Sequence, residues 1–252
     1  MFLQQGVDYN HLPSDLQLRY NHPMITEVKN VEFEIIKTPD PFTGYRDDIE
    51  RFWHEHCLRH PDAYSEKILN LFGLDENGDT VKLRIGWINY YEAFYSKIIG
   101  NIITRNLFSG AYILTSDGYY CLAVDMNSEI NLIGGVASKD DFEDGKYDPD
   151  LCLVREFREE TGMDITDSHF SYTLKYLKIT FGSENYFPVG LIYEVKTDYT
   201  KEEIEEQFKN NFRDNELQKL LFVKLDDSEE FAISTRRKYI VELFDQIRKN
   251  NP

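Results

Sequence analysis

The sequence predicts an α/β protein, an α/β/α sandwich with a mixed sheet and a smaller N-terminal α+β section. Strand-like apolar segments flank an acidic helix-like segment, and an amphipathic helix closes the chain. Hydrophobic residues make up 41% of the 252 residues, which is enough for a substantial core and argues against general disorder. We expect an N-terminal section at 1–108, for substrate recognition or dimerisation, and a main domain at 109–252.

The N-terminal section alternates strand-like and helix-like spacing. Strands are predicted at 31–37 and 81–85, and helices at 47–58, 63–72 and 90–103. Asn77-Gly78 is typical of a hairpin turn leading into a strand. Residues 1–28 are polar and contain Pro13 and Pro23, so we interpret them as loop.

One histidine cluster in this section resembles a metal site. His56 and His60 are one helical turn apart, but Leu58 stands where a second zinc-binding histidine would be required. No second ligand pair occurs at zinc-finger spacing. We therefore favour a solvated helix end before Pro61 over a metal site.

The second part begins with a predicted hairpin around Ser116-Asp117-Gly118. Its strands are predicted at 111–115, 119–125, 129–136, 170–180, 187–195 and 220–225. Its helices are predicted at 149–161, 201–207 and 234–249, the second of them short and exposed. Strands on both sides of a helix, followed by a closing helix, favour the sandwich.

The helix at 149–161 carries the clearest start and stop signals. Asp148 is predicted as its N-cap, with Pro149 at the first helical position. Gly162 is predicted as its end. The local sequence alone therefore defines this helix.

Three carboxylates crowd this helix. At about 100° per residue, Glu159 and Glu160 lie about 60° and 40° to either side of Glu156, on one narrow face. The residues expected to face the core on the other side are Leu151, Val154 and Phe157. Adjacent like charges repel, whereas Mg²⁺ or Mn²⁺, which prefer oxygen ligands, would stabilise the group. The alternative is an ordinary solvated acidic face.

The context of the helix favours the metal. A strand-like segment and the pair Gly134-Gly135 precede it, and this order resembles the Nudix box: Gly, five residues, Glu, seven residues, Arg-Glu-apolar-x-Glu-Glu-x-Gly-apolar. The second half matches at every specified position: Arg155, Glu156, Phe157, Glu159, Glu160, Gly162 and Met163. The resemblance covers about 110–250.

The first half of the box departs from the pattern. Nineteen residues separate Gly135 from Arg155, where the pattern has thirteen. Counting back eight residues from Arg155 gives Tyr147 instead of Glu. Four nearby carboxylates are open candidates for the missing one: Glu143, Asp144, Asp148 and Asp150. If none of them takes this role, the metal site is weakened.

The resemblance implies a Nudix-type diphosphatase (a pyrophosphohydrolase) that needs Mg²⁺ or Mn²⁺ and cleaves a nucleoside diphosphate derivative. The implied metal ligands are Glu156, Glu159, Glu160 and, from downstream, Glu216. One helix carboxylate, Glu156 or Glu159, also positions or deprotonates water. Arg155, four residues before Glu159, orients that carboxylate. The glycine pair brings backbone groups close to metal or phosphate.

The substrate classes implied are an NDP-sugar, such as a UDP-sugar, or ADP-ribose. The upstream order of Lys67–Leu71, the Asp75 turn, a second strand and Tyr90-Tyr91 is similar to a module of Nudix proteins that act on UDP-sugars. This similarity implies a strand within 67–71, against the helical spacing of 63–72. The alternative function is a Nudix-fold binding or sensor module with weak or no turnover.

Charge and cysteine content limit the partners. A net charge of −17 argues against a nucleic-acid partner. No apolar segment approaches a membrane span, and the N-terminus lacks signal-peptide features, so we expect no membrane partner. Three widely spaced cysteines, Cys57, Cys121 and Cys152, fit reduced thiols in the cytoplasm. The remaining partners expected are a small phosphorylated substrate and a second copy in a homodimer.

Overall fold

The computed structural model describes residues 25–99, 104–179, 188–227 and 238–250. They form two compact units. The first unit contains residues 30–99, 104–107, 179 and 188–189, and the second contains residues 25–29, 108–178, 190–227 and 238–250. The predicted mixed α/β class is confirmed, because helices accompany a multi-stranded sheet in each unit.

The first unit is built on a three-stranded mixed sheet in the order β2-β4-β3. β2 (Asn30–Ile35) runs parallel to β4 (Thr80–Asn89), and β3 (Lys67–Asn77) runs antiparallel to β4. The turn at Gly78, with φ of 59°, joins β3 to β4, as the Asn-Gly signal predicts. The core side chains of this sheet include Ile68, Leu69, Leu71, Leu83 and Ile85.

The helix predicted at 63–72 is wrong, because this segment enters β3. Pairing with β4 from Lys67 opposite Asn89 to Asn77 opposite Thr80 satisfies its backbone groups. Consecutive apolar residues are buried on both faces of the strand, so their spacing imitates a buried helix. The strand implied by the UDP-sugar module at 67–71 is the one observed.

Two helices complete the first unit. α2 (Arg46–Arg59) packs against α3 (Tyr90–Ile99), with the Phe52 ring centroid 5.7 Å from that of Phe94. The remainder of the helix predicted to residue 103 lies outside the described residues. α2 ends at Arg59, and the ring of His60 stacks 4.5 Å from that of His56. The helix end predicted before Pro61 is therefore confirmed.

The second unit contains an eight-stranded sheet whose main order is β1-β11-β12-β5-β6-β13. Its strands are β1 (Ile25–Glu27), β5 (Leu107–Leu114), β6 (Tyr119–Asp125), β7 (Ile130–Asn131), β8 (Ile133–Val136), β11 (Phe170–Lys178), β12 (Val189–Thr197) and β13 (Leu217–Lys224). β1 lies in a segment predicted as loop, where it pairs with β11. The single strand predicted at 129–136 is divided: β7 pairs with β6, and β8 pairs with β5.

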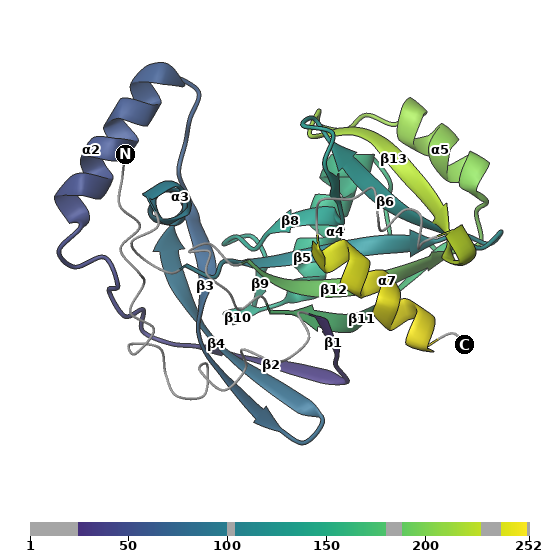
Figure 1. The fold of residues 1–252 in the computed structure, drawn as a ribbon, viewed down its shortest axis with the longest axis horizontal. Helices are drawn as coiled ribbons and strands as arrows, with labels where there is room; N and C mark the ends of the chain where they lie inside the picture. The colour runs from purple at the N-terminus through teal and green to yellow at the C-terminus, as the bar shows by residue number, and fades with distance from the viewer. Residues whose placement is uncertain (1–24, 100–103, 180–187, 228–237, 251–252) are drawn as a thin grey trace. The chain divides into compact units, whose positions relative to one another are not determined.

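Helices cover opposite faces of this sheet (Figure 1). Successive side chains of a strand point to opposite faces. Ile192 of β12 belongs to the cluster that contains Leu243 and Phe244 of α7 (Lys238–Asn250). The next residue, Tyr193, donates its hydroxyl hydrogen to Asp150 of α4 (Pro149–Thr161) at 2.6 Å. α7 and α4 therefore enclose the sheet, which is the layering predicted from the sequence.

A further helix, α5 (Lys201–Asn210), begins with a capping box between Thr200 and Glu203. It buries Ile204 and Phe208, so it is anchored more firmly than the short exposed helix predicted there. A 3-10 turn, η2 (Leu225–Asp227), follows β13. No described helix has the length and apolar character needed to cross a membrane.

Candidate active site

The acidic helix α4 begins and ends where its sequence predicts. Asp148 caps the N-terminus and accepts a hydrogen bond from the Asp150 N–H at 2.9 Å. Pro149 occupies the first helical position, where no N–H is needed. Gly162 adopts φ of 72°, and a Cβ there would lie 2.5 Å from the Asn211 Cβ. The cap signals therefore fix both ends of the helix.

The face that α4 presents to the sheet differs from the prediction. Leu151 is exposed, whereas Cys152, Leu153 and Phe157 are buried. Glu160 belongs to this buried face and is only 6% exposed. α4 packs on β8, and the side of the helix that faces the sheet is centred between Glu156 and Phe157. The three carboxylates therefore have different surroundings, and the Glu159 side chain, at 53%, is the most exposed of them.

The glycine pair on β8 allows the backbone to approach these carboxylates. Gly134 donates its N–H to Oε2 of Glu160 at 2.7 Å. Gly134 has φ of 142°, and a Cβ there would lie 2.1 Å from the Ser109 carbonyl oxygen. A Cβ on Gly135 would lie 2.2 to 2.6 Å from the Glu156 carboxylate oxygens. Gly134 therefore requires glycine, whereas a side chain at position 135 would displace the end of the Glu156 side chain.

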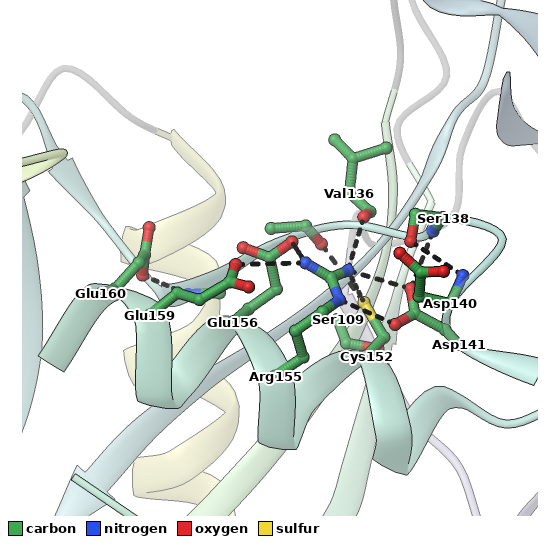
Figure 2. Close-up of polar contacts among 12 residues, drawn as sticks. Ser109, Val136, Ser138, Asp140, Asp141, Cys152, Arg155, Glu156, Glu159 and Glu160 are labelled. Atoms are coloured by element: carbon green, nitrogen blue, oxygen red, sulfur yellow. Dashed lines mark hydrogen bonds and ion pairs between the residues drawn. The ribbon is translucent and has the colours of Figure 1, made fainter. Parts of the chain in front are cut away.

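Arg155 connects the acidic helix to the loop after the glycine pair (Figure 2). Its Nε and Nη2 donate to the two carboxylate oxygens of Asp141, each at 3.0 Å. Its Nη1 donates to Glu156 at 2.6 Å and to Glu159 at 3.3 Å. Burial opposes the charged guanidinium, but the hydrogen bonds and charges of Asp141 and Glu156 outweigh it and raise the pKa of Arg155. Arg155 thus contacts Glu159, the carboxylate that it is predicted to orient, but it lies closer to Glu156.

Asp141 is the residue that the sequence analysis missed. Five residues separate it from Gly135, which is the spacing at which the Nudix pattern has its first Glu. It is fully buried, and it also accepts the Ser138 N–H at 2.7 Å. Counting forward from the glycine, instead of back from Arg155, would have found it. The six extra residues therefore lie between Asp141 and Arg155.

These extra residues form a small hairpin of β9 (Phe142–Glu143) and β10 (Lys146–Tyr147). Tyr147 is buried, with its ring centroid 5.8 Å from that of Phe142, so it has a packing role. None of the four carboxylates proposed for the missing Glu is described in contact with Arg155. Asp148 caps α4, Asp150 accepts from Tyr193, Asp144 adopts φ of 49° in the hairpin turn, and Glu143 is exposed on β9.

Glu216 comes close to the helix carboxylates from the segment before β13. Burial raises the pKa of Glu156 to about 7, although Arg155 lowers it, and the charges of Glu159 and Glu216 add to the rise. Burial raises the pKa of Glu160 to about 9, and the Gly134 N–H only partly opposes this. Burial, then Asp214 and Glu159, raises the pKa of Glu216. The folded chain therefore gathers mutually repelling carboxylates here.

The donor chemistry of this group suits a hard divalent cation. In the described part of the chain, no three Asp, Glu, His or Cys side chains stand close enough together to form a ready-made metal site. Glu160, however, is a buried carboxylate whose one described hydrogen-bond donor is the Gly134 N–H. Buried carboxylates normally have a cationic partner, and oxygen-preferring Mg²⁺ or Mn²⁺ would supply the missing charge.

No family model and no curated protein matches the chain. Solved structures that resemble it include DR0079 from Deinococcus radiodurans, 14% identical over 72% of this chain and 98% of that one, with a TM-score of 0.45. The MutT protein from Methanosarcina mazei Go1 is 15% identical over 58% of this chain and 95% of its own, with a TM-score of 0.41. The NUDIX domain of Shewanella oneidensis NrtR, solved with ADP ribose, is 13% identical over 66% of this chain and 100% of its own, with a TM-score of 0.38. Likeness at this level says nothing about substrate.

Proposed function

We propose that this chain is a metal-dependent Nudix-type pyrophosphohydrolase that cleaves the diphosphate linkage of a nucleoside diphosphate derivative. The supporting observation is that Glu156, Glu160 and Glu216 gather with Arg155 as their one described basic partner, beside Gly134, where the backbone leaves no room for a side chain. The match to the second half of the Nudix box supports the same chemistry. An NDP-sugar, such as a UDP-sugar, and ADP-ribose are the proposed substrate classes.

In this proposal Glu156, Glu160 and Glu216 hold Mg²⁺ or Mn²⁺, with Glu159 at the edge of the group. A cation held there would supply positive charge to the diphosphate oxygens and would make a bound water more acidic. Glu159 accepts the proton of the attacking water, because its side chain is the most exposed of the three on α4. The water oxygen bonds to phosphorus, and the bridging P–O bond to the leaving phosphate breaks.

Arg155 acts as a positioning residue. Its fork is anchored on Asp141 at 3.0 Å through both carboxylate oxygens, so its remaining nitrogen holds Glu156 at 2.6 Å in a fixed orientation. Gly134 holds Glu160 in the same way through its backbone N–H. The carboxylates are therefore oriented in advance, which limits the cost of reorganisation when the substrate binds.

The decisive experiment measures phosphate-containing products from a panel of nucleoside diphosphate derivatives, with Mg²⁺, with Mn²⁺ and with chelator. We expect metal-dependent turnover that falls at least about a hundredfold in Glu160→Gln, since metal ligands and their supports contribute effects of this size. Glu206→Gln, at an exposed position on α5, is the matched control and should keep full activity. Turnover unchanged in Glu160→Gln would contradict the site, and ligand binding without turnover of any panel member would favour the sensor module.

A further inference from the structure

A small pocket in the first unit is walled mainly by aromatic rings. Its volume is about 270 Å³, just below the roughly 300 to 1,000 Å³ of pockets that bind drug-sized ligands. Its walls come from α2, from the loop before β3 and from α3, which packs beside α2 (Figure 1). The lining residues include Trp53, His56, Asp62, Tyr64, Tyr90 and Phe94. The size suits one compact group rather than a whole nucleotide.

Helical spacing places most of these rings around the pocket. Trp53 and His56 are three residues apart on α2, so they share one face of that helix. Tyr90 and Phe94 are four residues apart on α3 and share a face in the same way. The Tyr90 N–H donates to the Glu66 carbonyl at 2.8 Å, which ties the loop before β3 to the start of α3. Three segments of the first unit are thereby held together around one space.

The rings stand in different planes. The Trp53 ring stacks on that of His56, with centroids 5.2 Å apart and planes 23° apart. The Phe94 ring crosses the Trp53 ring at 80°, with centroids 6.3 Å apart, and the Tyr90 ring lies nearly parallel to Phe94. Rings in several planes can surround a compact group from more than one side, which is the arrangement of an aromatic cage.

Packing of α2 on α3 accounts for only part of this ring cluster. Trp53, His56 and Phe94 are half-buried and contact one another. Tyr64 is 76% exposed and Tyr90 40% exposed, so these two rings add little to the packing of the helices. Aromatic rings gathered at an exposed rim leave apolar surface in water, and such surface commonly marks a binding site.

The charge of the pocket favours a cation. Ring faces carry negative partial charge, and Asp62 adds a carboxylate that has no ion pair with any described residue. None of the described lining residues is Lys or Arg. Desolvation, then the charges of His60 and Arg59, lowers the pKa of His56, so its ring is neutral at neutral pH. With a net charge of −17, the whole chain also attracts cations.

We propose that this pocket binds a small organic cation that carries a quaternary ammonium group. The methyl groups of such a cation are apolar and pack on the rings, and its charge is attracted by ring faces within about 6 Å. Asp62 supplies the counter-charge. Phosphate groups are disfavoured, because the described lining offers a carboxylate and neutral rings. The site lies within the first unit and holds whether or not the carboxylates on α4 hydrolyse a substrate.

Calorimetric titration of the full chain with choline tests the pocket. Neohexyl alcohol, the uncharged carbon counterpart of choline, should bind at least about tenfold more weakly, because it lacks both the attraction to ring faces and the pairing with Asp62. Asp62→Asn and Tyr64→Leu replace exposed residues, so both should fold, and each should weaken choline binding about threefold to tenfold. Asp47→Asn, at an exposed position near the start of α2, removes the same charge elsewhere and should bind choline like the wild type.

Three results would overturn the proposal. They are the absence of saturable choline binding, equal affinity for choline and neohexyl alcohol, and an unchanged choline affinity in both pocket variants. Adenosine forms a further arm of the titration, since nucleobases also stack on aromatic rings. Tighter binding of adenosine than of choline would identify a base-stacking site and overturn the assignment to a cation, whereas tighter binding of choline supports it.

Discussion

Replacing Glu160 with glutamine should stabilise the metal-free protein at alkaline pH. The Glu160 carboxylate is 6% exposed, and burial raises its pKa to about 9, against an ordinary value of 4.5. As the pH rises, the unfolded chain releases this proton before the folded chain does. The contribution of Glu160 to the free energy of unfolding is therefore fully present below about pH 4.5, and it is lost progressively as the pH rises towards 9.

The size of the effect follows from this interval. Each pH unit in the interval costs about 1.4 kcal/mol, so the upper limit at pH 8 is about 5 kcal/mol. Glutamine carries no charge and keeps an oxygen for the Gly134 N–H. Because the charge can be partly relieved by water and by movement of its neighbours, we expect a gain of roughly 2 to 4 kcal/mol at pH 8, shrinking below about 1 kcal/mol at pH 5.5.

Urea unfolding with chelator, followed by circular dichroism at pH 5.5 and pH 8, measures this gain. Glu206→Gln, which removes an exposed carboxylate from α5, should change stability by less than about 0.5 kcal/mol at both pH values. Added Mg²⁺ should stabilise the wild type and leave Glu160→Gln unaffected. If Glu160→Gln is no more stable than the wild type at pH 8, Glu160 is not a buried, uncompensated carboxylate.

Three further predictions concern the supports of the site. Asp141→Asn should lower the free energy of unfolding by about 2 to 4 kcal/mol, because it breaks a buried two-bond pair with Arg155, and urea unfolding will show whether it does. Arg155→Lys should lower kcat about tenfold to a hundredfold with little change in KM, since a single ammonium cannot hold Asp141 and Glu156 together; wild-type kinetics in this variant would rule out the positioning role. Gly134→Ala should destabilise by at least about 3 kcal/mol, because its Cβ meets the Ser109 carbonyl. Gly44→Ala, which shares a positive φ but meets no atom within 4 Å, should cost only about 1 kcal/mol, and equal losses in the two would exclude the clash as the cause.

Local signals were sufficient for α4 but not for β3. The Asp148 cap, Pro149 and Gly162 act within one turn of the helix ends, so their effect is readable from the sequence. The apolar side chains within 67–72, namely Ile68, Leu69, Leu71 and Phe72, fit a buried helix or a buried strand equally well. Their state depends on hydrogen bonds to β4, and only the folded sheet supplies these bonds.

The sequence likewise predicted one part of the candidate site and missed another. Glu156, Glu159 and Glu160 are placed together by helix geometry, which the sequence contains. The partner of Arg155 depends on the path of the loop, and the hairpin at 142–147 shifts the spacing, so counting back from Arg155 led to Tyr147 instead of Asp141. The approach of Glu216 also required the fold, because sequence separation carries no distance information.

By itself, the sequence determined the acidic helix, its ends, its crowded carboxylates and the layered α/β class, because these depend on contacts between near neighbours and on hydrophobic periodicity. Only the tertiary structure decided that Glu160 faces inward and that Asp141 anchors Arg155. Burial and pairing arise from segments far apart in the chain. They set the surroundings of the carboxylates on α4 from which the proposed active site follows.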